Sequence, residues 1–352
     1  MKSDLEISEI PFQDPLSAFE PHATQPYALL FDSALKHADQ GRYSFIAIDP
    51  FLTLESKDGK IKLSGDSFLG DPFNILQDLL QKYRLDPYPD LPPFQTGAAG
   101  YFGYDLGQHI EKLPRPRMDD MKFPDMALGF YDVIVAFDLF QFRSWIVSSG
   151  FPEKDAHKRL KKRQERIEWM KFQLTQNSKK ASAPFLPSLS TGSNFTRAGS
   201  QKSVQRVIDY IYAGDIFQAN LSQRFMALLP NIYDKFQLYK NLRNASPVSF
   251  AAYLNFGNTA ILSSSPERFI QLSRNKVQTR PIKGTRPRGS TPESDEEIAN
   301  QLIHSEKDRA ENVMIVDLLR NDLSRVCRDH SVQTPEICAI ESFATVHHLV
   351  ST

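Results

Sequence analysis

The sequence predicts an α+β fold, because short strand-like runs dominate its first half and helical periodicity becomes frequent in its second half. Residues with high strand propensity gather in ranges such as 41–50 and 127–147. Apolar residues recur at helical spacing in 153–174, 204–214 and 308–322. Of the 352 residues, 41% are hydrophobic and 24% are charged, which is ordinary for a globular protein with a large core.

The first half begins with a strand at 41–50 that ends in a proline turn. Asp71 and Pro72 then start a helix that runs to about Leu85, since Asp is a preferred N-cap and Pro is preferred at the first helical position. The apolar stripe of this helix is predicted to contain Phe73, Leu76, Leu80 and Tyr83.

A glycine-rich range, 97–105, follows this helix. It has neither a following helix nor the spacing of a dinucleotide-binding loop, so we interpret it as a strand that allows close backbone contact with a neighbour. The range 127–147 then supplies two strand runs, the first containing 133–135 and the second containing 145–147.

A basic helix is predicted at 153–174, and its run 158–163 taken alone would suggest a nucleic-acid partner. Four apolar residues at helical spacing instead give this helix a stripe to bury, so we interpret the basic residues as its solvated face. The four residues are Leu160, Ile167, Met170 and Leu174. The polar, proline-broken range 176–194 is predicted to be a linker or loop. It separates an N-terminal subdomain, 1–175, from a second region, 195–352.

Charge and cysteine content limit the functional classes. Lys+Arg and Asp+Glu both number 42, so no overall field favours nucleic acid or a membrane surface. Cys327 and Cys338 have no metal-binding or CxxC spacing and suggest a reducing compartment. The acidic, proline-broken start is unlike a signal peptide, and no apolar run reaches the length of a membrane span. We therefore expect a cytoplasmic protein without a nucleic-acid or membrane partner.

The second region begins with a helix that ends at Gly214. The range 215–222 then alternates like a strand, which places Gln218 on one side with two other polar residues. The helix predicted at 308–322 carries Glu311 near the edge of its apolar face. That face is predicted to contain Ala310, Val313, Met314, Asp317 and Leu318.

The range 278–289 places Lys283 between an apolar strand end and Gly284, in a segment punctuated by proline and glycine. Glycine permits backbone angles that are closed to other residues. Burial disfavours an ammonium ion and lowers the pKa of a lysine, so a lysine held in a pocket can be a nucleophile or a base. The alternative is a solvated loop with four basic residues.

Three further groups accompany this lysine. Glu267 lies at a strand–turn position, Glu311 lies on a helix, and His347 and His348 occupy a strand predicted at 343–350. Because adjacent strand residues face opposite sides, only one histidine can reach a common site. Each group has a structural alternative: Glu267 pairs with a nearby arginine, Glu311 is an ordinary surface acid, and the histidine lies in the core.

The ranges 263–269, with the sequence SSSPERF, and 281–285, with the sequence PIKGT, resemble the signature of the chorismate-utilising enzymes. The resemblance covers nearly the whole chain and is strongest over 214–352. It implies the architecture of that family, in which two large, mostly antiparallel sheets form a sandwich with helices outside. The lysine at 283 resembles the aminodeoxychorismate synthase branch, whereas the anthranilate synthase branch has alanine there.

For that branch the resemblance implies amination of chorismate at C4, on the path to p-aminobenzoate and folate. Lys283 would attack C2 of the ring and expel the C4 hydroxyl, after which ammonia would enter at C4 and release the lysine. Glu267 would be the general acid and base, and His348 and Thr285 would lie near the departing hydroxyl. Mg²⁺ would be the cofactor, with Glu311 as a ligand.

The resemblance also implies substrate contacts at Gln218, Gly284 and Thr285. Glutamine at 218 points to ammonia, because the relatives that form isochorismate or salicylate activate water with a lysine there. A partner glutamine amidotransferase would supply the ammonia, since Cys327 and Cys338 lack the nucleophile-elbow context of an amidotransferase triad. Two alternatives stay open: an anthranilate synthase component, and a non-catalytic fragment that only binds the amidotransferase.

An effector pocket is implied by similarity to the family's tryptophan site, although the usual LLES has the sequence Leu-Phe-Asp-Ser here. A structural or vestigial pocket is an equal alternative. The residues of this pocket would be Ser33, Tyr43, Ser44, Phe45, Pro247, Val248 and Ser249.

The sequence ends at Thr352, just after the histidine strand. The resemblance places further motifs beyond that point: a GSITGAPK-type loop, a glycine pair and an arginine for the two carboxylates, and a second magnesium glutamate. None of these is present in 1–352, so we expect a C-terminally truncated version of the fold in which these residues supply only part of the site.

Overall fold

The computed structural model of the protein describes residues 4–35, 40–114, 119–176, 189–230, 233–343 and 345–352. The chain divides into two compact units. The first unit consists of Met1–Ser178 together with Asn241–Thr352, and the second is Lys179–Lys240. This division differs from the predicted ranges 1–175 and 195–352, because strands from the second half of the chain join a sheet of the first unit.

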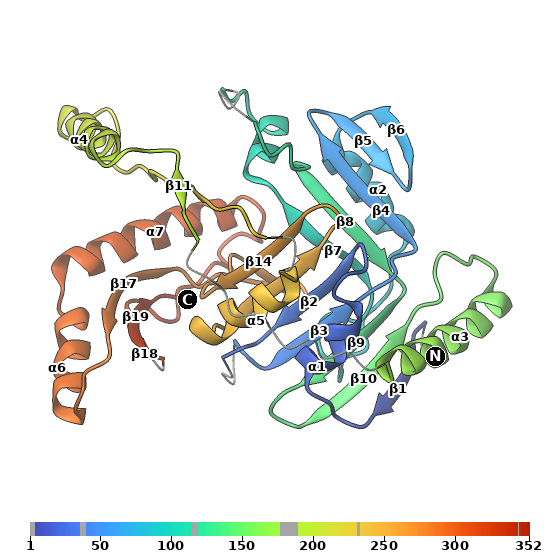
Figure 1. The fold of residues 1–352 in the computed structure, drawn as a ribbon. Coiled ribbons are helices and arrows are strands. Elements are labelled where there is room, and N and C mark those ends of the chain that lie inside the picture. Colours follow the sequence, from blue (N-terminus) through green and yellow to red (C-terminus); the bar gives the residue numbers. More distant parts are fainter. Residues whose placement is uncertain (1–3, 36–39, 115–118, 177–188, 231–232, 344) are drawn as a thin grey trace. The chain divides into compact units, whose positions relative to one another are not determined.

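The first unit contains a seven-stranded antiparallel sheet. Its strands, in spatial order, are β1 (Glu6–Ile10), β10 (Arg143–Ser148), β9 (Val133–Asp138), β3 (Tyr43–Ala47), β2 (Ala28–Asp32), β13 (Phe250–Asn255) and β14 (Ala260–Ser265). β13 pairs with β2, although more than 200 residues of sequence separate them, and β14, labelled in Figure 1, pairs with the other edge of β13. Short helices, α1 (Pro15–Phe19) and the 3-10 helix η1 (Glu20–His22), precede β2.

A five-stranded antiparallel sheet lies in the same unit. Its order is β6 (Asp66–Leu69), β5 (Lys60–Leu63), β4 (Leu52–Lys57), β8 (Met126–Tyr131) and β7 (Gly97–Phe102), and the 3-10 helix η2 (Tyr104–His109) follows β7. A cluster of buried residues from β2, β3, β7, β8, β9 and β13 joins the two large sheets. Antiparallel sheets and helices are thus combined in one unit, which confirms the predicted α+β fold.

The predicted strand run that begins at Ala127 is divided at Asp132, so the expectation of two strands in 127–147 was wrong. β8 ends before Asp132 in the five-stranded sheet, and β9 begins after it in the seven-stranded sheet. Asp132 is buried, and its carboxylate accepts hydrogen bonds from the Arg166 guanidinium at 2.9 Å. An ion pair with a residue that is distant in sequence therefore stabilises the point where the chain passes from one sheet to the other.

The interpretation of the glycine-rich range as a close-contact strand is confirmed by β7. It pairs with β8 along its whole length, with Gly100 opposite Leu128. A Cβ atom built on Gly100 would lie 2.0 Å from the carbonyl oxygen of Ala127. Because no side chain fits that gap, glycine is required for the two backbones to pair.

Helix α2 (Pro72–Lys82) begins as predicted, with the Asp71 carboxylate accepting from backbone N–H groups at 2.8 and 3.0 Å. Its predicted stripe was wrong at Leu80, which is 47% exposed, whereas Leu79 is buried. The two side chains are roughly 100° apart around the helix, so the buried face is centred one residue earlier than predicted.

In two other helices the buried face differs in part from the predicted one, although Ile167 and Met170 of the stripe predicted for α3 are buried as expected. In α3 (Ala156–Leu174), the predicted Leu160 is exposed and Arg163 is buried, where it donates to the Ser149 carbonyl at 3.2 Å. In α7 (Glu306–Ser324), Val313 and Leu318 of the predicted apolar face are about half exposed. The residues of α7 that are buried instead are Asp308, Asn312 and Val316.

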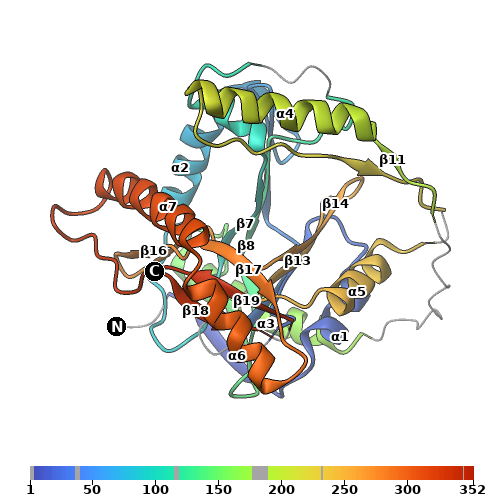
Figure 2. The same ribbon diagram turned by 90° about the vertical axis from the view of Figure 1, so that its left-hand side faces the viewer.

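The third sheet of the first unit carries most of the predicted site. It contains β17 (Ile282–Pro287), β19 (Val346–Val350) and β18 (Ala339–Ser342), in that order. Helix α6 (Pro292–Ile303), capped by Thr291, packs against it together with α7, as Figure 2 shows. A small hairpin of β15 (Gln271–Ser273) and β16 (Lys276–Gln278) precedes β17.

The second unit contains α4 (Arg197–Ala213), which ends at Gly214 in the left-handed conformation as predicted. A two-residue pairing joins β11 (Gly192–Ser193) to β12 (Phe225–Met226), and α5 (Lys235–Ala245) crosses into the first unit. The strand predicted at 215–222 was wrong: within the described residues it pairs with no strand, and alternation alone does not supply a partner. Most of the predicted linker 176–194 lies outside the described residues.

None of the helices in the described ranges combines the length and apolarity that crossing a membrane requires.

Candidate active site

The lysine predicted as a nucleophile lies on β17, at an irregularity in the sheet. The pairing of β17 with β19 shifts register between Ile282 and Thr285, and Gly284 within this bulge has a φ of +80°. A Cβ on Gly284 would lie 2.9 Å from a methyl carbon of Leu302. Both the backbone conformation and the space therefore require glycine beside Lys283.

Lys283 lies next to the predicted metal ligand. Its Nζ atom is 3.7 Å from Oε1 of Glu311, and the two side chains are 29% and 38% exposed. Residues 283 and 311 come together because α7 packs across β17, where the Arg286 guanidinium donates to the Asp308 carboxylate at 2.8 Å. Glu311 therefore lies beside Lys283, and its role as a metal ligand stays a prediction.

The predicted histidine is also in place. His348 pairs across the sheet with Thr285, and its Nδ1 atom lies 2.9 Å from Thr285 Oγ1. Burial lowers the pKa of His348 below its ordinary value of 6.5, against the opposing effects of the Glu341 and Glu267 carboxylates. At neutral pH the ring is therefore uncharged, so one nitrogen can accept a hydrogen bond or a proton and the other can donate a hydrogen bond.

The prediction that only one histidine reaches the site is confirmed. His347 faces the other side of β19, where it is buried and its Nε2 atom lies 2.9 Å from Asp295 Oδ1. This difference follows directly from the alternation of side chains along a strand.

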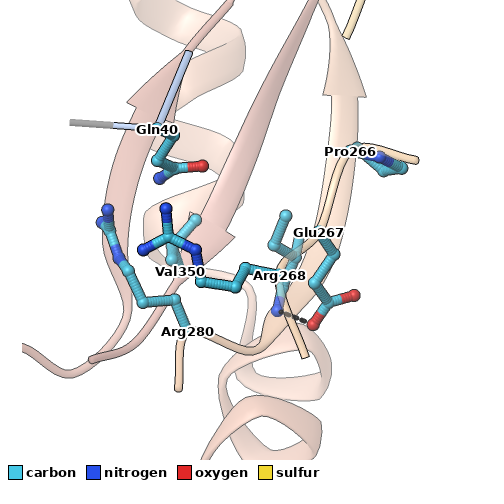
Figure 3. A pocket seen from close by; sticks show the side chains of 7 residues that line it. Gln40, Pro266, Glu267, Arg268, Arg280 and Val350 are labelled. Carbon is cyan, nitrogen blue, oxygen red and sulfur yellow. Dashed lines mark hydrogen bonds between the residues drawn. The ribbon is translucent and has the colours of Figure 1, made fainter. Parts of the chain in front are cut away.

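Glu267 is fixed beside the start of β17. The backbone N–H of Ile282 donates to Glu267 Oε1 at 3.0 Å, as the dashed line in Figure 3 shows. Neither nearby arginine pairs with it: Arg268 donates to Gln271, and Arg280 pairs with Glu341. The carboxylate is exposed and retains an oxygen for chemistry.

Sequence reasoning considered Arg268 and Arg280 only as possible partners of Glu267 and missed the polar group near them that contains Gln40 and Glu341. Figure 3 shows the guanidinium groups of Arg268 and Arg280 close together beside Gln40, in a small pocket that Glu267 also lines. Gln40 donates to Glu341 Oε2 at 3.2 Å, and Glu341 lies opposite His348 in the pairing of β18 with β19. Side-chain alternation along 339–342 could have indicated Glu341, because residues that pair across two strands, as Glu341 and His348 do, point to the same face of the sheet.

A magnesium site would have one ligand here. Glu311 is a partly exposed carboxylate, and Mg²⁺ commonly takes one or two carboxylates with water and substrate oxygens. Within the described ranges, no group of three or more His, Cys, Asp or Glu side chains is arranged to hold a metal ion. The donor at Glu311 fits the chemistry of magnesium, for which the resemblance implies a second glutamate outside 1–352.

The predicted substrate contacts belong to both units of the chain. Gly284 and Thr285 lie in the site, between Lys283 and His348. Gln218 belongs to the second unit, between α4 and β12, and its contact with substrate stays a prediction.

Of the predicted effector residues, Ser33, Ser44 and Ser249 are buried polar groups near β2, β3 and the start of β13, whereas Pro247 is exposed. Ser33 Oγ donates to the carbonyls of Tyr43 at 2.6 Å and Ser249 at 3.3 Å, and its N–H donates to Ser44 Oγ at 3.1 Å. The carbonyl of Val248, which follows Pro247, accepts from Leu35.

The alternation along β3 separates the members of this predicted pocket. The side chains of Tyr43 and Phe45 lie on the opposite face of β3 from Ser44, and the Phe45 ring packs against Phe94. Binding of an effector by these residues stays a prediction.

Known proteins resemble this chain over most of its length. The family model described as chorismate binding enzyme matches residues 28–352. Aminodeoxychorismate synthase component 1 of Salmonella typhimurium is 39% identical over 95% of this chain and 71% of its own length. Anthranilate synthase component 1 of Thermus thermophilus is 34% identical over 97% of this chain and 72% of its own length.

Among solved structures, anthranilate synthase component I from Streptococcus pneumoniae superposes with a TM-score of 0.76 at 27% identity. The similarity covers 90% of this chain and 69% of that one. Sequence, fold and the arrangement of Glu267, Lys283, Glu311 and His348 lead to one conclusion. The chain belongs to the chorismate-binding enzyme family.

Proposed function

We propose that this protein aminates chorismate at C4 to give 4-amino-4-deoxychorismate, in the synthesis of p-aminobenzoate and folate. The observation that carries the proposal is the lysine at 283, which lies beside Glu311 at the bulge of β17. Four relatives named aminodeoxychorismate synthase component 1 are 36–39% identical to the chain, which supports the same assignment.

The proposed reaction consists of two successive substitutions. The Lys283 amine forms a bond to C2 of the ring, the double bond shifts, and the C4 hydroxyl leaves as water after receiving a proton from Glu267. Ammonia then forms a bond at C4, the double bond shifts back, the lysine leaves as the neutral amine, and the new ammonium group returns a proton to Glu267. The net change is chorismate and ammonia to aminodeoxychorismate and water.

The remaining residues position the reacting groups. His348 and Thr285, at hydrogen-bond distance from each other, would orient and polarise the departing hydroxyl. Gly284 and Gln218 would contact the ring and the incoming ammonia. Glu311 would hold Mg²⁺, which when bound would stabilise negative charge on the oxygens of the substrate. A glutamine amidotransferase partner would deliver ammonia, in keeping with the component 1 names of the relatives.

A second candidate is the reaction of anthranilate synthase component 1. It is favoured by relatives of that name at 32–34% identity and by the fold similarity to the pneumococcal protein. The resemblance gives alanine at position 283 in that branch, so Lys283 weighs against it.

Incubation with chorismate, Mg²⁺ and ammonium tests the proposal directly. We expect mass spectrometry to detect free aminodeoxychorismate and a chorismate-derived adduct on the tryptic peptide that contains Lys283. Fluorescent anthranilate without an adduct would instead support the second candidate. Absence of any turnover, together with binding of the amidotransferase, would support a protein that only binds its partner.

The pH dependence of turnover provides a separate test of His348. Because burial lowers its pKa, the neutral ring required by the proposal is lost only as pH falls through a value below 6.5. We expect kcat to decrease as the pH falls, with a midpoint below pH 6.5. This acid limb of the plot of kcat against pH should change in the His348→Gln variant. The exposed His330→Gln should leave it unchanged. A midpoint above 6.5, or the same limb without His348, would contradict the assignment.

A further inference from the structure

The strand that carries His348 is held from its opposite face by a polar network, the β19 latch, formed by Arg288, Asp295, Ser342 and His347. His347 is 2% exposed, and both ring nitrogens have partners. Nε2 lies 2.9 Å from Asp295 Oδ1, and Nδ1 lies 2.7 Å from Ser342 Oγ. A carboxylate only accepts hydrogen bonds, so Nε2 carries the proton of that bond. The ring is therefore fixed at both ends.

Arg288 extends this network from α6 to the turn between β18 and β19. Its Nε and Nη2 atoms donate to the two oxygens of Asp295 at 2.8 and 2.6 Å. Its Nη1 atom donates to the Phe343 carbonyl at 2.6 Å, and its backbone N–H donates to the Thr345 carbonyl at 3.2 Å. A bidentate arginine–carboxylate pair fixes geometry as well as charge, so one guanidinium sets the position of both segments.

Two routes lead from the latch to the site. His347 is the chain neighbour of His348, so fixing one ring fixes the backbone that presents the other. Arg288 donates to the backbone carbonyl of Phe343, and the Phe343 ring packs edge-on against the His348 ring with centroids 5.5 Å apart. The other side of His348 meets Thr285 at 2.9 Å. The imidazole is thus located between a supported aromatic ring and the hydroxyl that it contacts.

We propose that the β19 latch is a positioning network that sets the distance between His348 and Thr285. Its members act through the β19 backbone and the Phe343 ring, and none of them belongs to the predicted substrate contacts. The consequence for catalysis rests on the proposed function, in which His348 and Thr285 flank the reacting C4 hydroxyl. Rates are sensitive to such support, because a displacement of about 1 Å can lower a rate roughly a hundredfold.

The test compares two similar ion pairs in the full chain. Arg288→Lys keeps the charge but loses the bidentate geometry, and Asp295→Asn removes the charge of its partner. The matched controls are Arg143→Lys and Glu9→Gln, which alter an exposed bidentate pair between β1 and β10. The ring resonances of His348 are followed by NMR with labelled histidine and assigned with His348→Gln.

We expect the latch variants to shift the His348 resonances and to lower kcat about tenfold, with KM changed less than twofold. The control variants should change neither quantity. Ser342→Ala removes a single hydrogen bond from an exposed side chain and should shift the resonances less, so the comparison holds even where Asp295→Asn does not fold.

Unchanged His348 resonances in Arg288→Lys and Ser342→Ala would overturn the proposal, whatever happens to stability. The same holds if the control pair shifts them equally. If the unmodified protein does not turn over chorismate, the proposed function fails, and the resonances still decide whether the latch positions His348.

Discussion

Replacing Lys283 by alanine is expected to lower aminodeoxychorismate formation at least about a thousandfold, because the reaction loses its nucleophile. The adduct on the peptide that contains residue 283 should disappear at the same time. Little effect on stability is expected, since the side chain is partly exposed and its ion pair with Glu311 spans 3.7 Å at the surface. Steady-state product formation and thermal unfolding of the variant measure the two effects separately.

Lys283→Arg is the matched control for charge. An arginine at this position can still pair with Glu311 but cannot form the covalent intermediate, so it should be as inactive as the alanine variant. Exposed Lys276→Ala, on the neighbouring β16, should retain full activity. An alanine variant that keeps its turnover and releases anthranilate would contradict the proposed reaction and favour the second candidate.

The largest effect on stability is expected at the crossing between the two large sheets. Asp132 is 2% exposed, and Arg166 holds its carboxylate with both Nε and Nη2. Arg166→Met leaves this carboxylate buried without its cation, which should decrease the free energy of unfolding by about 3–5 kcal/mol at pH 7. Chemical denaturation of parent and variant measures the difference.

The pH dependence of that difference has a definite sign. Burial raises the pKa of Asp132, and Arg166 opposes this effect in the parent. Without Arg166 the pKa rises further, so the folded variant takes up a proton as pH falls and regains stability relative to the parent. The loss should therefore be smaller at pH 5 than at pH 7.

Two controls isolate the buried charge. The exposed pair of Arg143 and Glu9 should lose less than about 1 kcal/mol in Arg143→Met. Adding Asp132→Asn to Arg166→Met should recover part of the stability, since the uncompensated charge is then absent. A loss in Arg166→Met that is small and the same at both pH values would show that the pair contributes little to the crossing.

Much of the site followed from the motifs. The resemblance identified Glu267, Lys283, Glu311 and His348, and the structure brings the last three to the sheet and helix expected for them. Strand alternation predicted that His347 and His348 face opposite sides, as they do, whereas the choice of His348 came from the resemblance.

The motifs did not identify some other residues near the site. Arg280 and Glu341 pair across 61 residues of sequence, and Gln40 reaches Glu341 from a loop 301 residues away. Nothing in the local sequence of Arg280 or Gln40 distinguishes them from surface residues. Glu341 becomes a neighbour of His348 because β18 and β19 pair in one sheet, and Arg280 and Gln40 contact Glu341.

The sequence by itself determined the local features of this protein. The helix start at Asp71 and the helix end at Gly214 each depend on hydrogen bonds or backbone angles within a few residues. Such signals are complete in the local sequence, so they could be predicted without knowledge of the fold.

Only the tertiary structure decided which faces are buried. Asp308 and Asn312 of α7 are buried in place of the more apolar face, because Arg286 and the Leu349 carbonyl satisfy their hydrogen bonds from other elements. The division of a continuous strand run at Asp132 likewise depends on a cation from α3. A buried polar group is stable only with its partner, and here the partners are distant in sequence, so local periodicity could not identify these positions.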